Sequence, residues 1–412
     1  MTESVWFKYG KKSLCLTVAK GCDHLQIKEP EHAVDPARFK RDVHDLLPAG
    51  LCSGTKVAIV VADKTRLCGY DRFLPDLVDI LEKKGVEPDA VTFYIAYGTH
   101  ARQQEDESVT AYGSLYDRYR FIHHDCRDKN NFRYLGRTRY NTRVHMRKDL
   151  LDSDLIISFG ALSHHYFAGY GGGRKLLFPG LGYIEDIYHN HSLFLNRTSK
   201  RLNPGCMPGN LEGNPLADDL EEIDTFNPVP RIQIHGILNS KGEVCRLITG
   251  TTYADFSAAC RRLDAYYRIK SRRQYLTVVM SCGGYPKDIN LIQAHKAINN
   301  AALFVKDGGN LMVMAQCPDG IGSETFLPYF TEKGFGHAFK RLGQAYEGNG
   351  GTALSMMSKT ARINIFLKSD LDDRLCSAIG VVKSDLNRIQ TLIDKTPQQD
   401  LACIYHAGLL IR

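Results

Sequence analysis

The sequence predicts an α/β protein of two domains with mostly parallel sheets, because short apolar runs alternate with amphipathic segments of helical length. Buried strands are expected at residues 57–62, 91–96, 154–159, 232–238, 276–280 and 311–315. The clearest helix is expected at 73–84, where Leu74, Leu77 and Leu81 recur on one side. The chain of 412 residues exceeds the usual length of one domain, so two cores are expected.

A charged segment with a helical pattern, residues 254–273, separates a longer first half from a shorter second half. The domain junction is predicted there. The first domain is expected to span 1–266 and the second 275–390. The last segment, 396–412, contains an apolar run that is expected to return to the first domain as a strand.

The composition argues against several classes of protein. No apolar run of 18 residues occurs, so no membrane span is expected, and a cytoplasmic protein is predicted. The 12 cysteines are scattered without CxxC pairs or Cys/His clusters of zinc-ligand spacing, which indicates reduced thiols. The net charge of +7 is dispersed and lacks interleaved aromatic residues, so no nucleic acid is expected as a partner. A homo-oligomer is possible.

Polar, reactive residues follow several expected strands directly. Asp63, Thr65 and Arg66 follow the run 57–62, and His100 follows the run 91–96 within Gly-Thr-His. His165 follows 154–159. Because ligands of open α/β sheets bind beyond the carboxyl ends of strands, these groups are expected to converge on one site. Taken singly, Asp63 is as well explained as a helix N-cap and His100 as an ordinary hydrogen-bonded histidine.

The densest signal is the glycine-rich stretch that contains Gly172, Gly173 and Lys175. Glycines beside cations let backbone N–H groups approach a phosphate, although Leu176 stands where a P-loop needs Ser or Thr. A lysine in such a pocket can also be a covalent anchor. His191 is a candidate metal ligand, but its spacing selects no metal. A flexible turn and a capping or core histidine are the simpler explanations.

These residues together resemble the lactate racemase family. The run HYFAGYGGGRK at 165–175, with Pro-Gly at 179–180 and Asn-His-Ser at 190–192, matches the signature of that family. Asp-Lys-Thr-Arg at 63–66, Gly-Thr-His at 98–100, Gly-Gly-Tyr-Pro at 283–286 and Gln-Ala-His-Lys at 293–296 match further motifs in order. The resemblance covers nearly the whole chain, and the block 165–191 is highly specific.

The resemblance implies a nickel-pincer nucleotide, a pyridinium mononucleotide joined through a thioamide to Lys175, whose nickel His191 also ligates. It implies an active-site cleft between a cofactor-binding first domain and a second domain that contributes substrate residues. Asp63, Thr65, Gly172 and Gly173 are expected near the cofactor, His100 and His165 as paired acid/base residues, and Arg66, Gln293 and Lys296 as substrate ligands. Dedicated cofactor-synthesis enzymes are expected as maturation partners.

The implied activity is racemisation or epimerisation of a small 2-hydroxy acid at C2. The cofactor takes the C2 hydrogen as hydride while a histidine takes the hydroxyl proton. Hydride then returns to the other face of the 2-keto acid and the opposite histidine reprotonates the oxygen, which inverts C2. Lactate-specific members close a tryptophan over the substrate, whereas this chain has Gly-Gly-Thr at 350–352 there and Ile292 in place of a frequent tyrosine. A substrate larger than lactate is therefore expected. The alternatives are a lactate racemase proper, an aldonate 2-epimerase and an inactive nucleotide-binding module.

Overall fold

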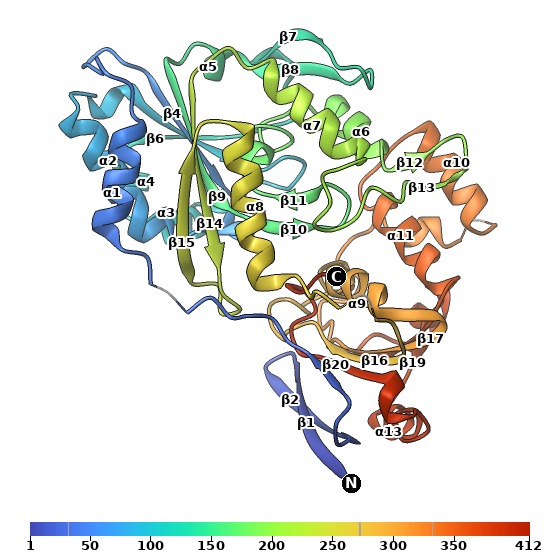
Figure 1. Ribbon diagram of the computed structural model, residues 1–412. Helices are drawn as coiled ribbons and strands as arrows, with labels where there is room; N and C mark the ends of the chain where they lie inside the picture. The colour runs from blue at the N-terminus through green and yellow to red at the C-terminus, as the bar shows by residue number, and fades with distance from the viewer. Residues whose placement is uncertain (32, 272, 332) are drawn as a thin grey trace. The chain divides into compact units, whose positions relative to one another are not determined.

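The computed structural model describes residues 1–31, 33–271, 273–331 and 333–412 of the chain. These residues fold as two compact units (Figure 1). The central unit comprises Glu29–Leu193 and Pro204–Asp264, and the terminal unit comprises Met1–Lys28, Phe194–Asn203 and Ala265–Arg412. None of the helices in the described ranges combines the length and the apolarity that crossing a membrane requires.

The central unit is built on a six-stranded sheet with the order β15-β14-β9-β4-β5-β6. All neighbours in it are parallel except β14 and β15. Its strands are β4 (Val57–Ala62), β5 (Val91–Ala96), β6 (Arg120–His123), β9 (Leu155–Ala161), β14 (Arg231–Leu238) and β15 (Val244–Gly250). All six residues of β4 are buried, as expected for a parallel strand that is covered on both faces. The predicted α/β class is confirmed.

Helices of the central unit pack on this sheet through apolar faces. The predicted helix at 73–84 is α2, in which Phe73, Leu77 and Leu81 are buried. Figure 1 shows α1 and α2 side by side, and the rings of Phe39 and Phe73 meet edge to face with centroids 5.6 Å apart. The helices are α1 (Pro36–Leu46), α2 (Tyr70–Lys83), α3 (Glu105–Tyr112), α4 (Leu115–Arg118), α5 (Lys148–Leu151), α6 (Ile184–Ser192), α7 (Pro215–Thr225) and α8 (Tyr253–Tyr267). Short hairpins pair β7 (Phe132–Arg137) with β8 (Arg143–Arg147) and β10 (Ser163–His165) with β11 (Gly169–Gly171).

The terminal unit contains a second six-stranded sheet, in which all neighbours are parallel. Its order is β19 (Val382–Lys383), β18 (Asn364–Lys368), β17 (Val305–Met314), β16 (Tyr275–Ser281), β20 (Leu401–Ile404) and β3 (Asp23–Leu25). The hairpin of β1 (Thr2–Tyr9) and β2 (Lys12–Ala19) carries the N-terminus and shares a core with this sheet (Figure 1). The two-residue strands β12 (Leu195–Asn196) and β13 (Arg201–Leu202) also pair here. The helices are α9 (Leu291–Ala301), α10 (Phe335–Gln344), α11 (Gly350–Thr360), α12 (Asp373–Ala378) and α13 (Leu386–Asp394).

Two expectations about the chain's ends are wrong. Residues 396–412 do not supply a strand to the first domain, because Leu401–Ile404 pairs in parallel with β16 and β3 of the terminal unit. Residues 1–28, which were assigned to the first domain, belong to the terminal unit for the same reason. The charged helix expected at 254–273 is α8 and ends at Tyr267, and residue 272 lies outside the described residues.

Candidate active site

The candidate site lies where three adjacent parallel strands of the central unit, β9, β4 and β5, end. The loops after these strands leave the same edge of the sheet. Tyr70 fastens this edge, because its hydroxyl accepts a bond from the N–H of Ala62 at 2.8 Å and donates to the carbonyl of Phe159 at 2.8 Å. As predicted, the fold brings Asp63 and His100 together, with 2.7 Å between Oδ2 and Nδ1.

Asp63 holds His100 and caps the following turn at the same time. Its Oδ1 accepts bonds from the N–H and the hydroxyl of Thr65 at 2.8 and 2.5 Å. Burial alone raises the pKa of Asp63, but the hydrogen bond and charge of His100 and the bonds from Thr65 outweigh burial, so the pKa is lowered. The carboxylate is therefore ionised and fixes the proton of neutral His100 on Nδ1. This leaves the Nε2 of His100, whose side chain is 50% exposed, as a proton acceptor.

His165 is held in the opposite tautomer. Its Nδ1 accepts bonds from the backbone N–H groups of Phe167 at 3.2 Å and Ala168 at 3.0 Å. A ring nitrogen that accepts such bonds bears no proton, so the neutral ring of His165 carries its proton on Nε2. In their neutral forms, His100 thus presents an acceptor at Nε2 and His165 a donor.

His164, the neighbour of His165, has a packing role instead. Its Nε2 lies 2.8 Å from Oδ1 of Asp264 on α8, and its side chain is only 3% exposed. The hydroxyl of Tyr170 donates to the other oxygen of Asp264 at 2.9 Å. Asp264 therefore fixes the β10–β11 hairpin that presents His165. Sequence reasoning missed Asp264, because it stands 100 positions from His164 in a charged segment without a local signature.

The glycines of the signature permit a close passage of the backbone. Gly172 has φ 79° and ψ −168°, a conformation that is essentially restricted to glycine. A Cβ atom there would lie 2.3 Å from the carbonyl oxygen of Ala161, and one at Gly173 would lie 2.7 Å from the ring of Phe256. Both glycines are thus required by packing against the end of β9 and against α8. Contact of their N–H groups with a phosphate stays a prediction.

Lys175 is set in a cationic environment. Burial, and then the positive charges of Arg66 and Arg174, lower the pKa of Lys175 to about 7. The guanidinium of Arg174 is buried over the rings of Tyr253 and Phe256, 5.1 and 5.2 Å from their centroids. Arg174 therefore contributes to packing as well as to charge. At neutral pH a large fraction of Lys175 is an unprotonated amine, which is the nucleophilic form.

His191 lies in the last turn of α6 and interacts electrostatically with Lys175. Burial, and then the charge of Lys175, lower the pKa of His191 to about 3, so its imidazole is neutral and suited to ligate a metal. The preceding residue anchors this turn, since the amide of Asn190 donates to Asp219 at 2.8 Å. Asp219 also accepts bonds from Thr138 and Thr142 of the β7–β8 hairpin. This buried network has no local signature and was not predicted.

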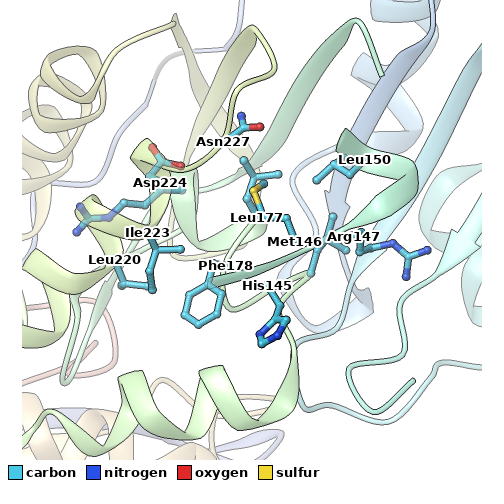
Figure 2. Close-up of a pocket in the computed structure, with 12 residues that line it drawn as sticks. His145, Met146, Arg147, Leu150, Leu177, Phe178, Leu220, Ile223, Asp224 and Asn227 are labelled. Carbon is cyan, nitrogen blue, oxygen red and sulfur yellow. The ribbon is translucent and has the colours of Figure 1, made fainter. Parts of the chain in front are cut away.

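A small cavity borders Arg174, Leu177 and Phe178. Figure 2 shows Met146, Phe178 and Ile223 around this space, which has a volume of about 20 Å³ for the centre of a water molecule. That volume holds about one water and no nucleotide.

The two residues expected to contact substrate from the second domain also lie together. Asn290 caps α9 by accepting a bond from the N–H of Gln293 at 3.0 Å. Lys296, one helical turn later, donates from Nζ to Oε1 of Gln293 at 2.7 Å. Gln293 and Lys296 thus form one polar surface in the terminal unit, and their contact with substrate stays a prediction.

We expect Gly172→Ala to lower the free energy of unfolding by about 3 kcal/mol or more, because strained φ/ψ and a backbone clash add together. Gly213→Ala is the control, since Gly213 has φ 61° with nothing within 4 Å of an added Cβ. It should cost about 1 kcal/mol. Urea denaturation of both variants measures the difference, and equal losses would contradict the packing role of Gly172.

We expect the stability of the unmodified chain, relative to Lys175→Met, to rise by about 2 kcal/mol between pH 7 and 9. The folded pKa of Lys175 is about 7, below the unfolded value near 10.5, so the unfolded chain binds more protons in this range. Stability then increases with pH, and the exposed Lys64→Met serves as control. Urea denaturation at each pH measures the free energy of unfolding of each protein. A difference between the unmodified chain and Lys175→Met that does not change with pH would refute the lowered pKa.

Comparison with known proteins gives matches along much of the chain. The family model described as lactate racemase N-terminal domain matches residues 26–203, and that described as lactate racemase C-terminal domain matches 271–344. A lactate racemase of Thermoanaerobacterium thermosaccharolyticum is 28% identical over 285 residues, 68% of this chain and 65% of the relative. One of Lactiplantibacillus plantarum is 27% identical over 273 residues, 66% of this chain and 62% of the relative. The matches thus span less than two thirds of either relative.

Solved structures share the fold. The structure of the lactate racemase apoprotein from Thermoanaerobacterium thermosaccharolyticum superposes with a TM-score of 0.88 at 22% identity, over 99% of each chain. A crystal structure of a protein from Thermotoga maritima gives a TM-score of 0.69 at 15% identity, over 94% of this chain and 99% of the other. The two domain matches establish that the chain belongs to the lactate racemase family.

Proposed function

We propose that this protein is an isomerase that inverts C2 of a small 2-hydroxy acid. The observation that carries the proposal is the pairing of Lys175, whose pKa is lowered to about 7, with the neutral imidazole of His191. An unprotonated lysine amine beside a neutral histidine and two arginines is an unusual combination for a packing role. It is suited to a covalently tethered, metal-containing anion.

The residues present fit a nickel-pincer nucleotide. Lys175 would carry the covalent link, His191 would ligate the nickel, and Arg66 would offset negative charge. When bound, the group supplies an acceptor for the C2 hydrogen as hydride, which avoids removing an unactivated C2 proton. Loading requires cofactor-synthesis enzymes as maturation partners.

His100 is the base for the substrate hydroxyl. Its Nε2 has the lone pair, because Nδ1 donates to Asp63 at 2.7 Å. When Nε2 takes the hydroxyl proton, the buried carboxylate of Asp63 stabilises the resulting imidazolium and keeps the ring in position. Thr65, which donates two bonds to Asp63, holds the carboxylate in turn.

His165 has the complementary duty. Its Nε2 carries the proton in the neutral ring, so it donates to an oxygen of the substrate while His100 accepts. One acceptor and one donor are the pair that reversible proton transfer at two faces of a 2-hydroxy acid requires. Arg66, Gln293 and Lys296 are proposed to bind the substrate carboxylate and hydroxyl, since Arg and Lys form strong charge-assisted bonds with carboxylates.

We further propose that the substrate is larger than lactate, such as a sugar acid. By the family resemblance, residues 350–352, Gly-Gly-Thr, take the place of a tryptophan of lactate-specific members. They form the buried first turn of α11, where a Cβ at Gly350 would lie 2.5 Å from Tyr329 and from Leu342. These side chains leave no room for a tryptophan at Gly350. Racemisation of lactate and 2-epimerisation of an aldonate are the two activities that an assay has to distinguish.

The test is a panel of enantiopure 2-hydroxy acids, from lactate to six-carbon aldonates, offered to cofactor-loaded enzyme and followed by chiral chromatography. We expect inversion at C2, faster with the longer acids. Activity confined to lactate would contradict the larger substrate. Cofactor-loaded enzyme that is inactive on the whole panel would favour a nucleotide-binding module instead.

We expect His100→Gln to lower kcat by about 100-fold or more, because general-base catalysis contributes about that much. His44→Gln, the same change at an exposed histidine of α1, should leave kcat unchanged. Steady-state kinetics with the best substrate of the panel measure both. Retention of full activity by His100→Gln, with unchanged cofactor loading, would exclude His100 as the base.

A further inference from the structure

Three side chains with metal-binding atoms meet at one end of the terminal unit, outside the residues discussed so far. They are Glu3 of β1, Cys22 in the turn after β2, and His24 of β3. Nε2 of His24 lies 3.4 Å from Oε1 of Glu3 and 3.7 Å from Sγ of Cys22. One ring nitrogen therefore faces a carboxylate oxygen and a sulfur at once, and the three ligand atoms lie within 4.8 Å of one another.

The backbone fixes the positions of Glu3, Cys22 and His24. Glu3 is fixed by the register of the β1–β2 hairpin, in which it is opposite Val18. A tight turn follows β2, closed by the bond from the N–H of Cys22 to the carbonyl of Ala19 at 3.1 Å, with Gly21 at φ 90°. This positive φ at the third position is typical of a type II turn. The chain then enters β3, where His24 is opposite Cys403 of β20.

Two of the three distances between ligand atoms are close to the edges of a tetrahedral zinc site. With Zn–N about 2.0 Å, Zn–O about 2.1 Å and Zn–S about 2.3 Å, tetrahedral angles give about 3.4 Å between N and O and about 3.5 Å between N and S. The observed values are 3.4 and 3.7 Å. A direct charge-assisted hydrogen bond between this ring nitrogen and the carboxylate would be shorter, about 2.8 Å.

One neighbour orients the ring of His24. Nδ1 of His24 lies 2.5 Å from the hydroxyl of Tyr405, which orients the ring with Nε2 toward Cys22 and Glu3. Bonds of this kind to the second ring nitrogen are a regular feature of metal-binding histidines. The side chains of Glu3 and His24 are 40% and 27% exposed, which leaves a path for an ion.

We propose that Glu3, Cys22 and His24 bind a zinc ion. Thiolate, imidazole and carboxylate are the donors that zinc takes in tetrahedral sites, and binding would release the thiol proton of Cys22 to solvent. Water would complete the tetrahedral set. The ion would tie the β1–β2 hairpin to β3. The three residues lack the sequence spacing of a zinc motif, because the fold brings Glu3 to Cys22 and His24 from the start of the hairpin.

The test uses full-length protein made without cofactor-synthesis enzymes, stripped with a chelator under reducing conditions and then given zinc or cobalt(II). We expect one equivalent of zinc after gel filtration, and with cobalt a thiolate charge-transfer band in the near ultraviolet. Cys22→Ser should lose both, and Glu3→Gln and Tyr405→Phe should each weaken zinc binding by about 10-fold or more.

Two controls separate this site from others. Cys15→Ser changes an exposed cysteine of β2 that lies outside the group and should keep one equivalent of zinc. His191→Ala should also keep it, because His191 belongs to the proposed nickel site. No zinc in the unmodified protein, zinc retained by both Cys22→Ser and Glu3→Gln, or zinc lost in His191→Ala would each overturn the proposal.

Discussion

Parallel pairing of β9, β4 and β5 is the constraint on which the candidate site depends. Because the three strands run the same way, the loops that carry Asp63, His100 and the β10–β11 hairpin leave one edge of the central sheet. Tyr70 reinforces that edge by joining the ends of β4 and β9. The segment that follows the glycine-rich stretch is bonded to the same edge, because the N–H of Gly98 donates to the carbonyl of Gly180 at 2.8 Å.

The electrostatics of the site follow from what each group faces. Asp63 is kept ionised by His100 and Thr65, and it thereby fixes which nitrogen of His100 accepts a proton. Burial, and then neighbouring positive charges, lower the pKa of Lys175 to about 7 and that of His191 to about 3. Burying an uncharged lysine and an uncharged histidine near an ionised aspartate contributes little to the stability of the fold. We interpret these groups as suited to bind a covalently held, metal-containing ligand.

Much of this could be predicted from local pattern. Continuous apolar runs predicted β4, β5, β9 and β14 of the central sheet and β16 and β17 of the terminal sheet, and the residues after β4 and β5 pointed to Asp63 and His100. What the pattern could not show is pairing between distant segments. β3 and β20 lie nearly 380 positions apart, which is why the ends of the chain were misassigned. His164 and His165 are adjacent, yet only Asp264, far along the chain, makes the first a packing residue. The roles of the site residues rest on the family resemblance.

We propose that Lys175 tethers a nickel-containing nucleotide. The decisive experiment is intact mass spectrometry with nickel analysis of protein produced together with cofactor-synthesis enzymes, comparing the unmodified chain with Lys175→Ala. We expect a nucleotide-sized mass increment and about one nickel per chain in the unmodified protein, and neither in the variant. An unmodified mass without nickel, under conditions that load a known relative, would contradict it.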